Sequence, residues 1–227
     1  TTADSGSVTI DYSVPTISSI AVTESGGSSV SSGGYGNTGT YSVVVTASEA
    51  LDAAPTLTVG GGSVGSGSAS NSDTVWTYTF TPTDADEAVT IDVAAGAITD
   101  NAGNDNTAAA TQFAFTHDAT TPTLSTIAMS TSGNTGYAKS GDTITLTITA
   151  SEAVTGLTCT IDGETATMGG SGTSWTAALT ISGDETAGAA TFSCGSYSDA
   201  AGNAGSADTT ADSGSVTIDY SAPTLST

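Results

Sequence analysis

The chain has 227 residues and carries 23 Asp and Glu against a single Lys, a formal net charge of −22 at pH 7. Binding to nucleic acid or to an anionic membrane surface needs clustered Lys and Arg, so the composition excludes both as partners. Charged residues are only 11% of the chain, and Thr, Ser, Gly, Ala and Val dominate the remainder. We therefore expect a folded chain whose acidic groups keep it soluble or bind small hard cations.

A repeat organises the chain. The first thirteen residues, TTADSGSVTIDYS, return unchanged at 209–221. Weaker echoes recur at half this spacing: Pro-Thr at 15–16 and 122–123, Ala-Ser-Glu-Ala at 47–50 and 150–153, and Asp-x-Ala-Gly-Asn at 100–104 and 199–203. Two related domains of about 100 residues therefore alternate in a predicted tandem array. The predicted parts are 1–14 as the last strand of a preceding repeat, 15–121 and 122–222 as the two domains, and 223–227 as the start of the next repeat.

Short strands separated by turns are predicted along the whole chain, without a competing helical pattern. In the second domain they lie near 123–130, 143–150, 156–161, 165–168, 174–181, 189–194 and 214–220. The clearest is TITLTIT at 143–149, which alternates with period 2 as a half-buried strand does. Seven short strands and one Trp per domain are typical of an immunoglobulin-like sandwich. The predicted fold class is all-β, with two such sandwiches in an extended rod and with Trp76 and Trp175 in the cores.

The order of Pro-Thr, Ala-Ser-Glu-Ala, Trp and Asp-x-Ala-Gly-Asn resembles the bacterial Ig-like repeats of giant surface adhesins and other extracellular filament proteins. The likeness covers both domains. It implies an extracellular, cell-surface spacer that is not an enzyme and is often stiffened by calcium. The residues themselves also argue against an enzyme. One His and one Lys offer few catalytic bases, and the acidic residues that can be placed lie at domain junctions rather than in a cleft.

Sandwich topology brings the incoming linker and two loops together at the N-terminal end of each domain. The candidate metal ligands there are Asp11, Glu49, Asp100 and Asn104 in the first domain, and Asp118, Glu152, Asp199 and Asn203 in the second. Calcium accepts 6–8 oxygens in irregular geometry and is the predicted ion. Magnesium needs a stricter octahedron, and soft metals need His or Cys ligands.

A simpler interpretation stands beside the metal site. Asp-x-Ala-Gly-Asn is also a good tight turn, because Gly and Asn tolerate positive φ and Asp accepts local backbone hydrogen bonds. Glu49 and Glu152 could bind backbone amides of their own loops. The acidic stretch at 84–87 is expected to be a solvated turn.

Cys159 and Cys194 fall on predicted neighbouring strands. In an extracellular setting this predicts a disulfide, with two buried thiols as the alternative. His117 stands alone beside the linker and is expected at the surface.

The predicted function is a structural stalk or spacer repeat whose partners are neighbouring copies of the same repeat. The main alternative is a self-assembling filament subunit, in which residues 1–13 complete a sheet of a neighbour in the slot of 209–221. A surface for glycans or ice, built from Thr rows, is a third and less supported reading.

Overall fold

The computed structural model describes residues 9–225, and the chain divides into two compact units, Thr1–Ala119 and Thr120–Thr227. The predicted terminal strand at 1–14 therefore lies largely outside the described residues. Every regular element described is a β-strand, so the all-β prediction is confirmed. Within residues 9–225, no helix is long and apolar enough to cross a membrane.

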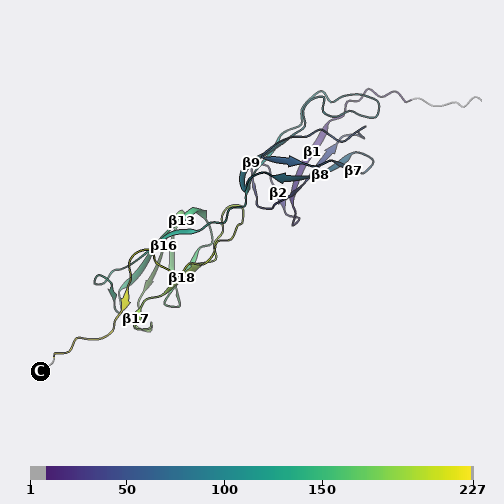
Figure 1. The fold of residues 1–227 in the computed structure, drawn as a ribbon. Coiled ribbons are helices and arrows are strands. Elements are labelled where there is room, and N and C mark those ends of the chain that lie inside the picture. Colours follow the sequence, from purple (N-terminus) through teal and green to yellow (C-terminus); the bar gives the residue numbers. More distant parts are fainter. Residues whose placement is uncertain (1–8, 226–227) are drawn as a thin grey trace, which may run out of the picture. The chain divides into compact units, whose positions relative to one another are not determined.

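The first unit contains ten strands within its described part. They are β1 (Ile17–Glu24), β2 (Ser29–Val30), β3 (Tyr35–Gly36), β4 (Tyr41–Ala47), β5 (Thr58–Gly60), β6 (Gly62–Val64), β7 (Ser68–Ser70), β8 (Val75–Pro82), β9 (Asp86–Asp92) and β10 (Phe113–Asp118). One sheet has the order β2-β1-β4-β8-β6, with β7 also paired to β8, and the other has the order β3-β10-β9-β5. Figure 1 shows β1, β2, β7, β8 and β9 in this unit.

Alternation of side chains builds the core of the first unit. In β4, YSVVVTA, every second residue from Tyr41 to Ala47 is buried, because successive side chains of a strand point to opposite faces. The buried side chains of β8 include Trp76, as predicted, and Phe80. Together with Val89, Ile91 and Phe115 of the second sheet they form one apolar cluster. The sandwich therefore closes around a single core.

The described part of the second unit contains nine strands. They are β11 (Leu124–Thr131), β12 (Tyr137–Ala138), β13 (Thr143–Val154), β14 (Thr158–Ile161), β15 (Glu164–Thr165), β16 (Thr167–Thr180), β17 (Gly188–Ala189), β18 (Phe192–Gly195) and β19 (Thr217–Ile218). The sheets have the orders β11-β13-β16, β12-β19-β17 and β15-β14-β18. Trp175 of β16 packs partly buried against the core, as predicted.

Two differences from the predicted strands come from short pairings. The strand expected at 214–220 is regular only at Thr217–Ile218, and Gly214 before it has a φ of 76°. The two-residue strand β12 was not predicted, because two residues are too short to show a period. Its parallel pairing with β19 nevertheless determines which side chains of that last strand face the core.

The prediction that His117 lies at the surface is wrong. His117 is 3% exposed, and its Nδ1 atom lies 2.7 Å from the hydroxyl of Tyr41. Parallel pairing of β10 with β3 places His117 opposite Gly36, just as β19 places Ile218 opposite Ala138. His117 thus occupies a core position of the last strand, and the hydrogen bond to Tyr41 makes its burial tolerable.

This buried pair gives a testable prediction. Tyr41→Phe should lower the unfolding free energy of the first unit by about 1–3 kcal/mol, because it leaves the buried imidazole of His117 without its partner. The matched control is Tyr35→Phe, since the Tyr35 ring is 50% exposed. Urea unfolding of the full chain measures both, and equal effects of the two substitutions would contradict the assignment.

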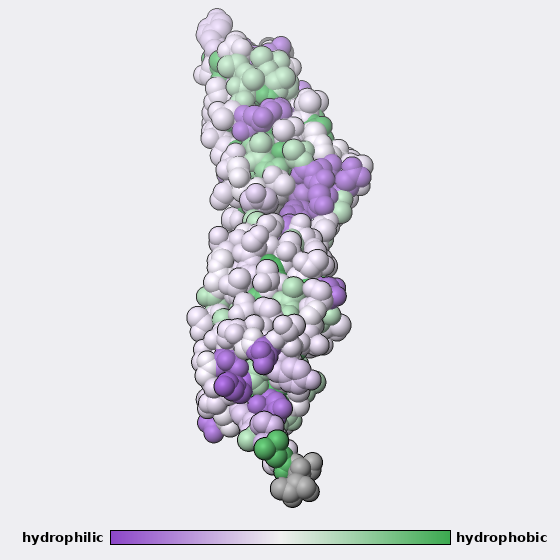
Figure 2. Space-filling model, turned by 90° about the vertical axis from the view of Figure 1, so that its left-hand side faces the viewer, coloured by the Kyte–Doolittle hydropathy of each residue, from purple (hydrophilic) through white to green (hydrophobic). Residues whose placement is uncertain are grey.

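The surface is dominated by small polar residues. The face in Figure 2 is mostly pale, with separate hydrophilic groups and scattered hydrophobic ones. Among the described residues, the large hydrophobic side chains that are exposed are Ile10, Tyr12, Val14, Tyr35, Tyr137, Tyr220 and Leu225. Several of these belong to the two copies of the repeated thirteen-residue segment.

Candidate functional site

The recurring Pro-Thr and Ala-Ser-Glu-Ala motifs contact each other within each unit. The amide of Thr16 donates to Ser48 Oγ at 3.0 Å, and the amide of Ser48 donates to the carbonyl of Thr16 at 2.9 Å. Thr123 and Ser151 make the same two bonds in the second unit, at 2.9 and 2.8 Å. The motif serine therefore fastens the residue after the proline to the loop that carries Glu49 or Glu152.

The Asp-x-Ala-Gly-Asn motif folds into a loop around the Asp100 carboxylate. Oδ1 of Asp100 accepts the amides of Ala102 and Asn104, both at 2.8 Å, and Oδ2 accepts the side-chain amide of Asn104 at 2.8 Å. Gly103 has a φ of 93°, which glycine adopts without strain. Asp100 is only 2% exposed, so the loop holds one carboxylate in a fixed place.

These bonds lower the pKa of Asp100. The side-chain hydrogen bond from Asn104 contributes most, followed by the backbone amide of the same residue. Since the folded state holds the carboxyl at a lower pKa than the unfolded state, the stability is present above the unfolded pKa. It is lost as the pH falls through the folded pKa. The Asp100 loop is therefore stable with its carboxylate ionised.

The second unit contains the same loop. Oδ1 of Asp199 accepts the amide of Asn203 at 2.9 Å, and Oδ2 accepts its side-chain amide at 2.8 Å. Gly202 has a φ of 91°, and Asp199 is 5% exposed. The motif thus folds as a turn around its aspartate carboxylate in both units.

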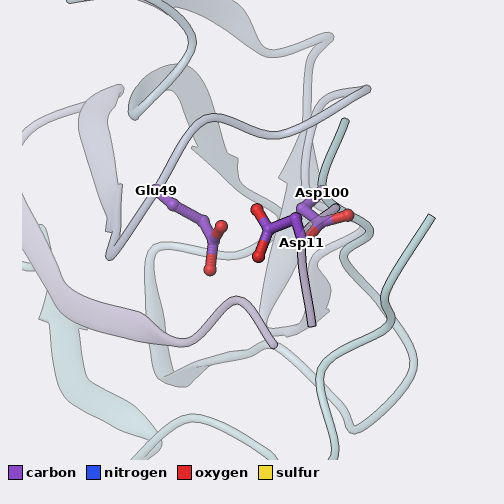
Figure 3. A group of neighbouring side chains, drawn as sticks. All are labelled: Asp11, Glu49 and Asp100. Carbon is purple, nitrogen blue, oxygen red and sulfur yellow. The ribbon is translucent and has the colours of Figure 1, made fainter. Parts of the chain in front are cut away.

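Three carboxylates converge in the first unit. Ligand atoms of Asp11, Glu49 and Asp100 all lie within 4.8 Å of one another. Figure 3 shows the carboxylates of Glu49 and Asp11 facing each other, with Asp100 beside Asp11. The three residues come from the segment before β1, the loop after β4 and the loop between β9 and β10, and they line a surface hollow of about 340 Å³.

The cluster is electrostatically unfavourable by itself. Burial raises the pKa of Glu49, and the negative charges of Asp11 and Asp100 raise it further. Two like charges 4 Å apart repel by about 1 kcal/mol even in water. The chain has no Lys or Arg before Lys139, so no lysine or arginine of the first unit offsets this repulsion. A divalent cation would do so.

The other predicted ligands are placed as follows. Asn104 supports the cluster, because its side-chain nitrogen donates both to Asp100 and, at 3.3 Å, to the carbonyl of Asp11. Asp118 ends β10, Glu152 lies in β13, and Asp199 and Asn203 lie in the loop after β18. Metal binding by these residues stays a prediction.

The acidic stretch at 84–87 covers the bend before β9 and the first two residues of that strand. Oε1 of Glu87 accepts the amides of Thr83 and Asp84, at 2.6 and 3.1 Å. This carboxylate therefore closes its own turn, as expected for a solvated acidic loop.

A disulfide joins Cys159 of β14 to Cys194 of β18. The two residues are register partners with Cα atoms 4.1 Å apart. Their backbone groups bond elsewhere: the carbonyl of Cys159 accepts from Ala166, and the amide of Cys194 donates to Asp208. Side chains approach most closely at such non-hydrogen-bonded pairs. Both cysteines lie inside the core of the second unit.

The sequence profile of the bacterial Ig-like domain matches residues 28–117 and again residues 118–218. The chain belongs to this family. Its two copies stand in tandem, so the resemblance drawn from the motifs is confirmed. No curated protein matches the chain.

Solved structures with a similar arrangement of strands include Rst D1-D2, at 10% identity and a TM-score of 0.48, covering 91% of this chain and 99% of that one. The match to the fibronectin(III)-like modules of Clostridium thermocellum CbhA covers 90% of this chain and 93% of that one, at 14% identity and a TM-score of 0.31. The match to the Yersinia pseudotuberculosis adhesin InvE covers 83% of this chain and 56% of that one, at 13% identity and a TM-score of 0.26. Similarity at this level says nothing about what the bacterial Ig-like chain binds.

Proposed function

We propose that this chain is a structural spacer of a large extracellular adhesin or surface filament, built by repetition of bacterial Ig-like units and stiffened by calcium. Two features support a structural role: the tandem family match and the separate apolar core of each unit. The proposal assigns no catalysis to the chain. The observation that carries the calcium part is the convergence of Asp11, Glu49 and Asp100.

The origin of the three carboxylates explains how an ion would stiffen the chain. Asp11 belongs to the segment that enters the unit, whereas Glu49 and Asp100 belong to loops of the unit itself. Calcium binds 6–8 oxygens, so carboxylates, backbone carbonyls and water would share its coordination. An ion bound by all three residues would fasten the incoming segment to the unit and reduce bending between successive repeats.

Glu49→Gln tests this proposal, because its effect should change sign with calcium. In a chelator the substitution should raise the melting temperature of the first unit, since it removes the repulsion that raises the pKa of Glu49. With calcium, the wild-type chain should gain about 2.7 kcal/mol at a concentration 100-fold above Kd, and the variant should gain much less. Differential scanning calorimetry of the full chain in both buffers measures the two effects.

Asp52→Asn is the matched control. Asp52 is exposed and lies in the same unit, and its substitution removes the same charge. It should leave the calcium-dependent gain intact. If Glu49→Gln and Asp52→Asn respond equally to calcium, the ion acts by general screening of the acidic chain, and the proposed site is wrong.

A further inference from the structure

The second unit joins its first strand directly to the segment that leads into its last strand. The amide of Asp212 donates to the carbonyl of Ile127 at 2.8 Å, and Oδ2 of Asp212 accepts the amide of Ile127 at 2.7 Å. The amide of Met129 donates to the carbonyl of Ser213 at 2.9 Å. Ala128 and Ser213 form a parallel bridge at the same place. We call these three hydrogen bonds the clasp.

The first unit has a hollow where the second unit has its clasp. His117 and Ile218 occupy equivalent places in the last strands, so the counterpart of Asp212 is Thr111. Among the described residues, no hydrogen bond joins β1 to the segment 110–113. Instead, residues of β1 and of this segment line a surface hollow of about 340 Å³. The first strand and the last segment of this unit are therefore not fastened to each other.

A second parallel contact is common to both units. In the first unit the amide of Thr116 donates to the carbonyl of Gly34 at 2.9 Å, and in the second unit Thr217 donates to Gly136 at 2.8 Å. These bonds belong to the parallel pairs of β10 with β3 and of β19 with β12. The clasp is thus an addition of the second unit to a shared plan.

The clasp lies between the two strands that tension would pull apart. In a stretched chain, force enters a unit through its first strand and leaves through its last strand. Parallel strands pulled in this way are drawn from opposite ends, so all bonds between them bear the load together and must break together. In the first unit, the load passes instead through the antiparallel pair of β1 with β4 and through the short strand β3. Because forced unfolding depends on the unfolding barrier, the clasp should raise the force that the second unit withstands.

The disulfide does not support the clasp. It joins Cys159 to Cys194, whereas the clasp joins residues that precede Cys159 to residues that follow Cys194. The clasp therefore breaks before tension reaches the disulfide. Once the unit opens, the disulfide keeps the residues between the cysteines out of the stretched chain. For the strand-bearing ranges 17–118 and 124–218, the first unit should release about 300 Å and the second about 170 Å.

We propose that the two units open in a fixed order under tension, the first at a lower force and the second, held by the clasp, at a higher force. The inference rests on the proposed structural role, because it concerns a spacer that is pulled. The first unit would lengthen the chain and relieve the load while the second stays folded. The difference between the repeated units thus has a mechanical consequence.

Optical-tweezers stretching of the full chain tests the order of opening. The chain is held through tags at its two ends in a chelator, since calcium at Asp11 and Glu49 would add a link to the first unit. The release of about 300 Å should occur at a lower force than the release of about 170 Å. The reverse order, or equal forces for the two releases, would overturn the proposal.

Asp212→Ala tests the clasp itself. It removes the carboxylate that accepts the amide of Ile127, so at constant force the short release should become about tenfold faster while the long release keeps its rate. Asp184→Ala is the matched control, because it removes the same charge from an exposed side chain of the same unit, and it should change neither release.

Asp212→Asn keeps the test decisive if the alanine variant fails to fold. It retains an oxygen acceptor without the charge, so it should speed the short release by a smaller factor. A short release whose rate ignores the substitutions at Asp212 would show that the clasp bears no load. Such a failure leaves the calcium proposal standing, because that is read from the melting of the first unit.

Discussion

Replacing Cys159 and Cys194 together by alanine is expected to destabilise the second unit by about 3 kcal/mol and to leave the first unit unchanged. The disulfide closes a loop with a sequence separation of 35 residues, and its loss returns that conformational freedom to the unfolded chain. In a unit of about 100 residues, this should lower the melting temperature by more than about 10 °C. Calorimetry of the full chain resolves the two units.

The first unit is the internal control for this substitution, because it contains no cysteine. Ser193→Ala is the control within β18, since Ser193 lies exposed beside Cys194. A shift of both transitions by the same amount would contradict a local role of the disulfide, and so would an unchanged second unit.

Phe80→Ala should have the opposite selectivity and destabilise the first unit by about 3–5 kcal/mol. Phe80 is fully buried, and its ring centroid lies 6.2 Å from that of Tyr41 and 6.4 Å from that of Phe115. The substitution removes these contacts and opens a cavity in a unit without a disulfide.

Urea unfolding of the full chain measures the effect of Phe80→Ala. Phe80→Leu is the graded control, because it keeps most of the apolar volume and should cost less than half as much. Equal losses for alanine and leucine would show that the ring does not fill the core as described.

The fold was predictable where strands are long enough to alternate. TITLTIT at 143–149 falls within β13, and the two Trp residues lie in equivalent strands, β8 and β16. His117 was misplaced because its burial depends on pairing with β3, a strand of two residues. Its partner Tyr41 is 76 residues away, and no local pattern links them.

The candidate site was partly predictable, because sandwich topology alone brings the loop of Glu49 and the loop of Asp100 to one end of a unit. The role of Ser48 and Ser151 was missed, although the recurrence of the Ala-Ser-Glu-Ala motifs that contain them was visible. The use of the Asn104 side chain as a donor to Asp100 depends on loop geometry, which the motif spacing does not specify.

The most direct test of the calcium-stiffened spacer is a calcium titration of the isotope-labelled full chain, followed by backbone amide NMR relaxation. The account predicts saturable shifts at Glu49 and Asp100, together with increased order at Asp11 and Tyr12, because the ion joins the entering segment to the loops. Saturable shifts without ordering of Asp11 would mean that the ion binds but does not fasten the segment. No saturable shift at these residues would contradict the account.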